Sequence, residues 1–149
     1  MNAIKHKLLL ADDDIDDRIF FKEALEELPI NSTLTTVKDG VELMHLLNTE
    51  LNDLPDILFL DLNMPRKTGF ECLSEIKLSH KLKDLPIIIL STSFDHAVVN
   101  LLYKNGAHYY IRKPSEFSKL KQIIYEAISL TTTIVQKKPD EEKFVLNNS

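Results

Sequence analysis

Chemically reactive side chains follow directly after four short apolar runs of this sequence. These are Asp12 and Asp13 after residues 7–11, Asp61 after 57–60, Ser91 after 86–90 and Lys113 after 109–112. A short apolar run bounded by turn residues is typical of a strand buried on both faces. The carboxyl ends of parallel strands meet at one edge of a sheet, which is where open α/β sheets bind ligands. We therefore expect these side chains to share one rim of the molecule.

The acidic members of this set predict a divalent cation. Carboxylates crowded to about 4 Å repel one another by about 4 kcal/mol per pair at an effective dielectric constant of about 20. Either their pKa values rise or a cation lies among them. Oxygen ligands with open positions for water and phosphate suit Mg²⁺, with Mn²⁺ as an alternative. No His or Cys follows these runs to favour zinc.

The same set suits phosphoryl transfer. A carboxylate such as that of Asp61 can act as a nucleophile and carry an aspartyl phosphate. The transferring group needs positive charge and a hydroxyl donor on its oxygens, which Lys113 and Ser91 would supply. Taken singly, each residue is ordinary, because a lone Asp there usually caps a helix and a lone Lys is usually solvated. Their joint placement on successive strands indicates a site.

Five strand–helix pairs must position these residues. Strands are predicted over 7–11, 34–37, 57–61, 86–91 and 109–112, and helices over 15–28, 41–49, 70–79, 96–103 and 116–130. Asp14 and Asp95 are the expected caps of the first and fourth helices, and Gly106 should end the fourth. Such alternation implies a parallel sheet with helices on both faces. The expected strand order is 2-1-3-4-5, that of the flavodoxin-like (βα)5 fold.

The composition fits one soluble α/β domain. A chain of 149 residues, 44% of them apolar, can build one good core and is too short for two ordinary domains. The net charge of −5 argues against a nucleic-acid partner, and no apolar run approaches the length of a membrane span. The lone cysteine, Cys72, fits a reducing cytoplasm. We expect a domain over 1–130 and a weakly ordered tail over 131–149, too short for an output domain, in which Phe144–Leu146 could dock.

Five motifs, in order along the chain, carry a resemblance to a known family. They are Leu9-Leu-Ala-Asp-Asp-Asp14, Leu60-Asp-Leu-Asn-Met-Pro65, Gly69, Ile89-Leu-Ser-Thr-Ser93 and Tyr110-Ile-Arg-Lys-Pro114. Together they resemble the receiver domain of two-component response regulators, over roughly residues 7–130. The triple aspartate, the run 65–69 and the connection before Pro86 are most similar to single-domain regulators that partner bacteriophytochromes.

The resemblance implies a phosphoacceptor and a metal site. Asp61 would take a phosphoryl group from a histidine of a sensor kinase, which in this subgroup is of the phytochrome type. Asp13, Asp61 and the main-chain carbonyl of Asn63 would bind Mg²⁺ directly, whereas Asp12 would act largely through water.

The resemblance also implies a conformational switch. Lys113 would pair with the phosphate, and a cis bond to Pro114 would help to aim it. Ser91 would swing toward the phosphate and Tyr110 would follow inward, although the neighbouring Tyr109 is an alternative for this ring. These movements would remodel the switch face, by which we mean the surface formed by the fourth helix, the fifth strand and the fifth helix.

The leading hypothesis is a signalling protein that catalyses only its own phosphorylation and dephosphorylation. It would signal by binding a partner protein or by passing the phosphate on. A phosphatase would want a second carboxylate two residues after its nucleophile, where Asn63 stands, and a nucleotide-binding module would want a Gly-rich loop after the first strand. A degenerate receiver would lack a key group, and none is missing. A homodimer through the switch face, with Phe117, Ile124 and residues 131–135 contributing, is left open.

Overall fold

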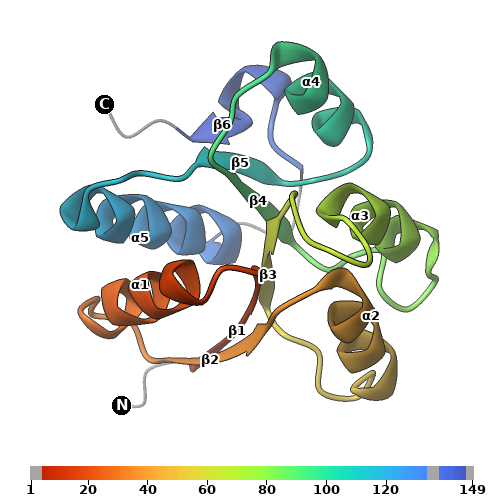
Figure 1. Ribbon diagram of the computed structural model, residues 1–149, viewed down its shortest axis with the longest axis horizontal. Helices are drawn as coiled ribbons and strands as arrows, with labels where there is room; N and C mark the ends of the chain where they lie inside the picture. Colours follow the sequence, from red (N-terminus) through yellow and green to blue (C-terminus); the bar gives the residue numbers. More distant parts are fainter. Residues whose placement is uncertain (1–4, 134–137, 147–149) are drawn as a thin grey trace.

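The computed structural model describes residues 5–133 and 138–146 and shows one parallel sheet with helices on both faces (Figure 1). The strands are β1 (His6–Ala11), β2 (Ser32–Val37), β3 (Ile57–Asp61), β4 (Ile87–Ser91), β5 (Tyr109–Arg112) and β6 (Val145–Leu146). They lie in the order β2-β1-β3-β4-β5-β6, and every neighbouring pair is parallel. Every residue of β3 and β4 is buried, as expected of strands that are covered on both faces.

Four of the α-helices, α1 to α4, begin at polar residues that cap their first turns. They are α1 (Ile15–Glu26), α2 (Gly40–Thr49), α3 (Gly69–Leu78), α4 (His96–Lys104) and α5 (Phe117–Thr133), with a short 3₁₀ turn, η1 (Glu141–Lys143), before β6. The carboxylates of Asp14, Asp39 and Asp95 each accept hydrogen bonds from amides of the following turn, and Thr68 opens a capping box in α3. The predicted caps at Asp14 and Asp95 are confirmed.

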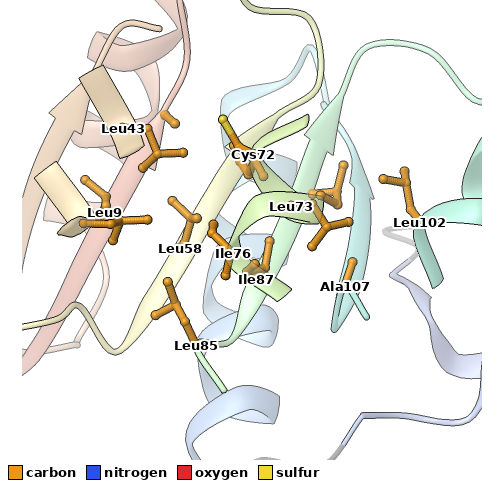
Figure 2. Close-up of a cluster of buried hydrophobic side chains, with 14 of the residues drawn as sticks. Leu9, Leu43, Leu58, Cys72, Leu73, Ile76, Leu85, Ile87, Leu102 and Ala107 are labelled. Carbon is orange, nitrogen blue, oxygen red and sulfur yellow. The ribbon is translucent and has the colours of Figure 1, made fainter. Parts of the chain in front are cut away.

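Alternate strand residues face two separate apolar layers. One layer lies under α2, α3 and α4, where Leu9 and Leu58 pack with Leu43, Leu73 and others of the cluster shown in Figure 2. The other lies under α1 and α5 and holds the intervening strand residues. This two-sided burial keeps the sheet rigid, and the ends of β1, β3, β4 and β5 therefore form a fixed platform.

The predicted fold class and the strand order 2-1-3-4-5 are confirmed, with one strand added. β6 extends the sheet beyond β5, so part of the tail that was expected to be weakly ordered is paired with the domain. The last helix also runs past the predicted boundary at residue 130, to Thr133, and the hydroxyls of Thr131 and Thr132 donate to the carbonyls of Ala127 and Ile128. Within the described residues, no helix has the length and apolarity required to cross a membrane.

Candidate functional site

The carboxyl ends of four strands bring the predicted site residues to one rim. Ala11 pairs with Leu60 in the register of β1 and β3, and Asp61 pairs with Leu90 in that of β3 and β4. Ser91 lies opposite Arg112 of β5. Asp12 and Lys113 each come one residue after these positions, and so the rim predicted from the sequence exists.

Three carboxylates of this rim form an acidic cluster. One oxygen each of Asp12, Asp13 and Asp61 can be chosen so that all three lie within 4.8 Å of one another. Asp12 and Asp61 are buried, whereas Asp13 is exposed. A set of oxygen donors that is closed on the protein side and open to solvent at Asp13 fits Mg²⁺ or Mn²⁺, which keep water ligands.

The Lys113 side chain neutralises part of this cluster. Its ammonium donates hydrogen bonds to Asp12 Oδ2 at 2.9 Å and to Asp17 Oδ2 at 3.0 Å, and it lies 3.6 Å from Asp61 Oδ2. Burial alone would lower the pKa of Lys113, but the hydrogen bonds to Asp12 and Asp17 raise it above the usual value for lysine. The ammonium is therefore charged throughout the physiological range.

Asp17 is a site residue that sequence reasoning missed. The sequence pattern places it only in the first turn of the first helix, where an acidic side chain is favourable in any protein. In the structure this half-exposed carboxylate reaches over to Lys113 and shares it with Asp12. The available signal was its position one turn after Asp13 and Asp14, which places it on the same side of α1 as the rim.

Burial makes Asp61 costly to ionise. Desolvation raises its pKa to about 6, against the opposing pull of Lys113 and with a further rise from Asp12. At neutral pH the group is still mostly a carboxylate, which is the form that can attack phosphorus. The ionised side chain is stabilised by any cation that binds beside it.

The turn after Asp61 fixes the position of this carboxylate. The main-chain N–H of Asn63 donates to Asp61 Oδ1 at 3.3 Å, and Met64 is buried in the core. Gly69 donates its N–H to the Leu62 carbonyl, and a Cβ atom there would lie 2.2 Å from the carbonyl oxygen of Asp61. Only glycine permits α3 to start this close to the phosphoacceptor candidate.

Ser91 and Tyr110 lie on one chain of hydrogen bonds. The Ser93 amide donates to Ser91 Oγ at 3.2 Å, and the Tyr110 hydroxyl donates to the Ser93 carbonyl oxygen. Tyr110 is already buried in this structure, whereas we expected an inward movement. Tyr109 faces the opposite layer of the sheet, so Tyr110 is the ring on the Ser93 side.

The expected cis bond before Pro114 is wrong. No cis peptide bond occurs in the described chain, and Lys113 reaches the acidic cluster from a trans peptide. The trans form is intrinsically favoured even before proline, and the hydrogen bonds to Asp12 and Asp17 already orient the ammonium.

The fold and the site together define a class of protein. Its members are α/β proteins with an acidic cluster and a lysine at the carboxyl edge of a parallel sheet. Residues 8–125 match the family model of the response regulator receiver domain. The chain belongs to this family, as its motifs indicated.

Relatives of this chain include a response regulator and a chemotaxis protein. Response regulator Rcp1 of a Synechocystis species is 32% identical over 127 residues, which cover 83% of this chain and 86% of Rcp1. A chemotaxis protein CheY homolog of Campylobacter jejuni is 32% identical and covers 82% of this chain and 92% of its own.

Solved structures of response regulators share the fold of this chain. The phosphorylated cyanobacterial phytochrome response regulator RcpA superposes with a TM-score of 0.78 at 33% identity, covering 89% of this chain and 98% of its own. The Mn²⁺-bound form of Rcp1 superposes with a TM-score of 0.77 at 28% identity, with 89% and 99% covered.

Proposed function

We propose that this protein is a single-domain response regulator that accepts a phosphoryl group on Asp61 from a histidine of a sensor kinase. The observation that carries the proposal is the position of Lys113, whose ammonium lies 3.6 Å from Asp61 and also pairs with Asp12 and Asp17. This arrangement pairs a nucleophile with a fixed cation at the place where phosphoryl oxygens would lie. Asp12, Asp13, Asp61 and the main chain of Asn63 would hold Mg²⁺, with Mn²⁺ as a substitute.

Each residue has one task in the transfer. An Asp61 oxygen forms the bond to phosphorus while the bond from phosphorus to the imidazole nitrogen of the donor breaks, and the imidazole leaves with a proton from water. Lys113 pairs with a phosphoryl oxygen, and the Ser91 hydroxyl donates to another. The acidic cluster would hold the divalent cation, which would supply positive charge to the phosphoryl oxygens.

The signal would be a population shift of the switch face. Ser91 would donate to the phosphoryl group, and it is connected through Ser93 to Tyr110 of β5. A phosphoryl group that bonds Ser91 in one of two arrangements favours that arrangement by its differential affinity. A partner protein then reads α4, β5 and α5.

The nature of the partners is supported by the relatives. The likeness to the phytochrome response regulator RcpA favours a phytochrome-type kinase, and the net charge of −5 favours a protein target over nucleic acid. We place the exchange in the cytoplasm, which the lone reduced Cys72 fits. The protein would signal and would not turn over substrate, because Asn63 stands where a hydrolase wants its second carboxylate.

A homodimer through the switch face stays a prediction with one correction. Ile124 is wholly buried against the sheet and cannot contribute to an interface, because it belongs to the inner side of α5. Phe117 packs on Phe20 of α1 and is only partly accessible. Residues 134–137 lie outside the described residues. Concentration-dependent sedimentation tests this prediction.

A small acyl phosphate tests the phosphoacceptor directly. With Mg²⁺ and acetyl phosphate, we expect one phosphoryl adduct per chain by intact mass, and hydroxylamine should remove it because it is an acyl phosphate. Asp61→Asn should abolish the adduct. Asp56→Asn is the matched control, because it removes an exposed acid just before the same strand and should leave the adduct intact. An equal adduct on Asp61→Asn, or continuous turnover of phosphomonoesters, would contradict the proposal.

A further inference from the structure

The segment Lys138–Leu146, which we call the C-terminal segment, is paired with the outer edge of β5. Val145 lies opposite Tyr110 and Leu146 opposite Ile111, both in parallel register, and the Tyr110 amide donates to the Phe144 carbonyl at 3.0 Å. Figure 1 shows β6 beside β5, with α4 close to the same end of the segment. The segment therefore satisfies a backbone donor of the residue that we assign to the switch.

Side chains of the C-terminal segment bury themselves on both faces of the sheet. Phe144 is 1% exposed and joins the layer under α2, α3 and α4, whereas Leu146 joins the layer under α1 and α5. The Phe144 ring makes an edge contact with Tyr103 at a centroid distance of 5.2 Å and lies 6.4 Å from the Tyr110 ring. The segment is thus part of the packing around Tyr110.

Tyr103 of α4 holds the other end of the segment. Its hydroxyl donates to the Pro139 carbonyl at 2.9 Å, and the Lys138 ammonium lies 3.8 Å from the centre of its ring. The paired strand is only two residues long. Its docking therefore depends on a few side-chain contacts, and the loss of one of them should change the docked population measurably.

An unbroken path of contacts joins this segment to the phosphoryl site. It runs from Ser91 to Ser93 by a hydrogen bond, from Ser93 to Tyr110 by another, and from Tyr110 to Phe144 by main-chain and ring contacts. Tyr110 is inward in the structure in which the segment is docked. Through these contacts, a state that favours the inward position of Tyr110 would favour docking, and docking would favour the inward position in turn.

We propose that the C-terminal segment is an intramolecular latch whose docking on β5 and Tyr103 is coupled to the phosphoryl state of Asp61 through Tyr110. This inference rests on the proposed function. Phosphorylation tightens the latch, and a docked latch raises the affinity of the site for a phosphoryl group. The phosphorylated protein then presents a surface built jointly from α4 and the C-terminal segment, including the exposed acids Asp140, Glu141 and Glu142.

Hydrogen exchange of the full chain tests the coupling. With Mg²⁺ and beryllofluoride, a mimic of the phosphoryl group, the amides of residues 138–146 should exchange about five-fold or more slowly than with Mg²⁺ alone. The same addition to Asp61→Asn should change nothing. Equal exchange in the wild-type chain with and without beryllofluoride would overturn the latch.

Two variants test the reciprocal effect. Tyr103→Phe removes only the hydroxyl bond to Pro139, and Phe144→Ala removes the ring beside Tyr110. Both variants should weaken beryllofluoride binding, Phe144→Ala more than Tyr103→Phe. In each variant, the factor by which affinity falls should equal the factor by which the protection of residues 138–146 by beryllofluoride falls. Leu34→Ala is the control, since Leu34 is a partly buried residue of β2, at the opposite edge of the sheet from β6. Unchanged beryllofluoride affinity in Tyr103→Phe and Phe144→Ala would overturn the proposal.

The outcomes separate this inference from the function on which it rests. An Asp61 adduct with unaltered exchange of the segment refutes the latch alone, whereas absence of the adduct refutes the phosphoacceptor. Protection of residues 138–146 that rises with protein concentration, together with a dimer in sedimentation, would show that the segment docks on a second copy. That result would overturn the intramolecular latch.

Discussion

Two buried titratable side chains lie at opposite ends of the sheet, and their charged surroundings differ. Asp61 lies at the carboxyl end of β3, and His108 lies directly before β5, at the amino end. Desolvation raises the pKa of Asp61 to about 6, and it lowers the pKa of His108 to about 4 with help from Lys77 and Lys138. In both cases burial favours the neutral form.

The difference lies in what surrounds each group. His108 accepts a hydrogen bond from the Ile87 amide on Nδ1, and burial and the cations of Lys77 and Lys138 lower its pKa, so it stays neutral and structural. Asp61 has Lys113 and two more acids beside it. At the amino end the buried side chain is neutral. At the carboxyl end the carboxylates stay charged, and their mutual repulsion favours the binding of a cation.

Removal of Lys113 should have the largest effect on this contrast. Lys113→Met leaves buried carboxylates without their ammonium and should destabilise the metal-free protein near neutral pH by about 3–5 kcal/mol. Lys121→Met is the control, because it breaks a partly exposed pair with Glu27 and should cost about 1 kcal/mol or less. Urea unfolding measures both, and equal losses would show that the rim lysine is no more important than a surface one.

His108 should make the protein less stable in acid. Its folded-state pKa of about 4 lies below the unfolded value of about 6.5, so the unfolded chain binds more protons between these pH values. Stability therefore rises with pH across this window, by up to about 3 kcal/mol. His108→Asn keeps an acceptor for the Ile87 amide and should remove this rise. Urea unfolding from pH 4 to 7 gives the result, and an unaltered slope would refute it.

Asp61 should act with the opposite sign in the metal-free protein. Its folded-state pKa of about 6 exceeds the unfolded value of 3.8, so the folded chain binds more protons between them and stability falls as pH rises. Asp61→Asn should therefore match the wild type near pH 4 and exceed it at neutral pH by about 1–3 kcal/mol. The gain should shrink when Mg²⁺ is added. A variant that is less stable than the wild type at neutral pH would contradict the raised pKa.

Asp17 should have the smallest effect. Asp17→Asn leaves Lys113 to Asp12 and Asp61, which should lower the pKa of Asp61 below its wild-type value of about 6. Because Asp17 is half exposed, the change in stability should be about 1 kcal/mol or less. Carbon NMR of the Asp61 carboxyl follows the titration. Asp16→Asn removes the same charge one residue earlier, and an equal shift in it would show that Asp17 acts only through net charge.

The sequence predicted those parts of the site that lie on regular elements. Asp61, Ser91 and Lys113 follow apolar runs whose length and flanking turns are unambiguous, and parallel topology then brings their ends together. The strand order followed from the alternation of elements, although β6 did not, because two residues carry no periodicity. Docking of Phe144 was anticipated only as an option, since its site forms from Tyr103 and Tyr110 in the folded chain.

The partners of individual side chains could not be predicted from the sequence. Whether Asp17 turns to solvent or to Lys113 depends on the rotation of α1 against the sheet, which capping and periodicity do not determine to within one residue. The inward position of Tyr110 likewise depends on the Ser93 carbonyl and on Phe144. Sequence patterns place residues on elements, whereas partners within a site are decided by packing.

The sixth strand also affects the colloidal behaviour of the protein. β6 covers part of the β5 edge, including the Tyr110 amide, and its removal would leave an unpaired edge beside apolar surface that Phe144 and Leu146 now cover. Uncovered edges of this kind are templates for pairing between chains. A chain truncated after Thr133 should consequently aggregate more readily during expression and storage than the chain of 149 residues.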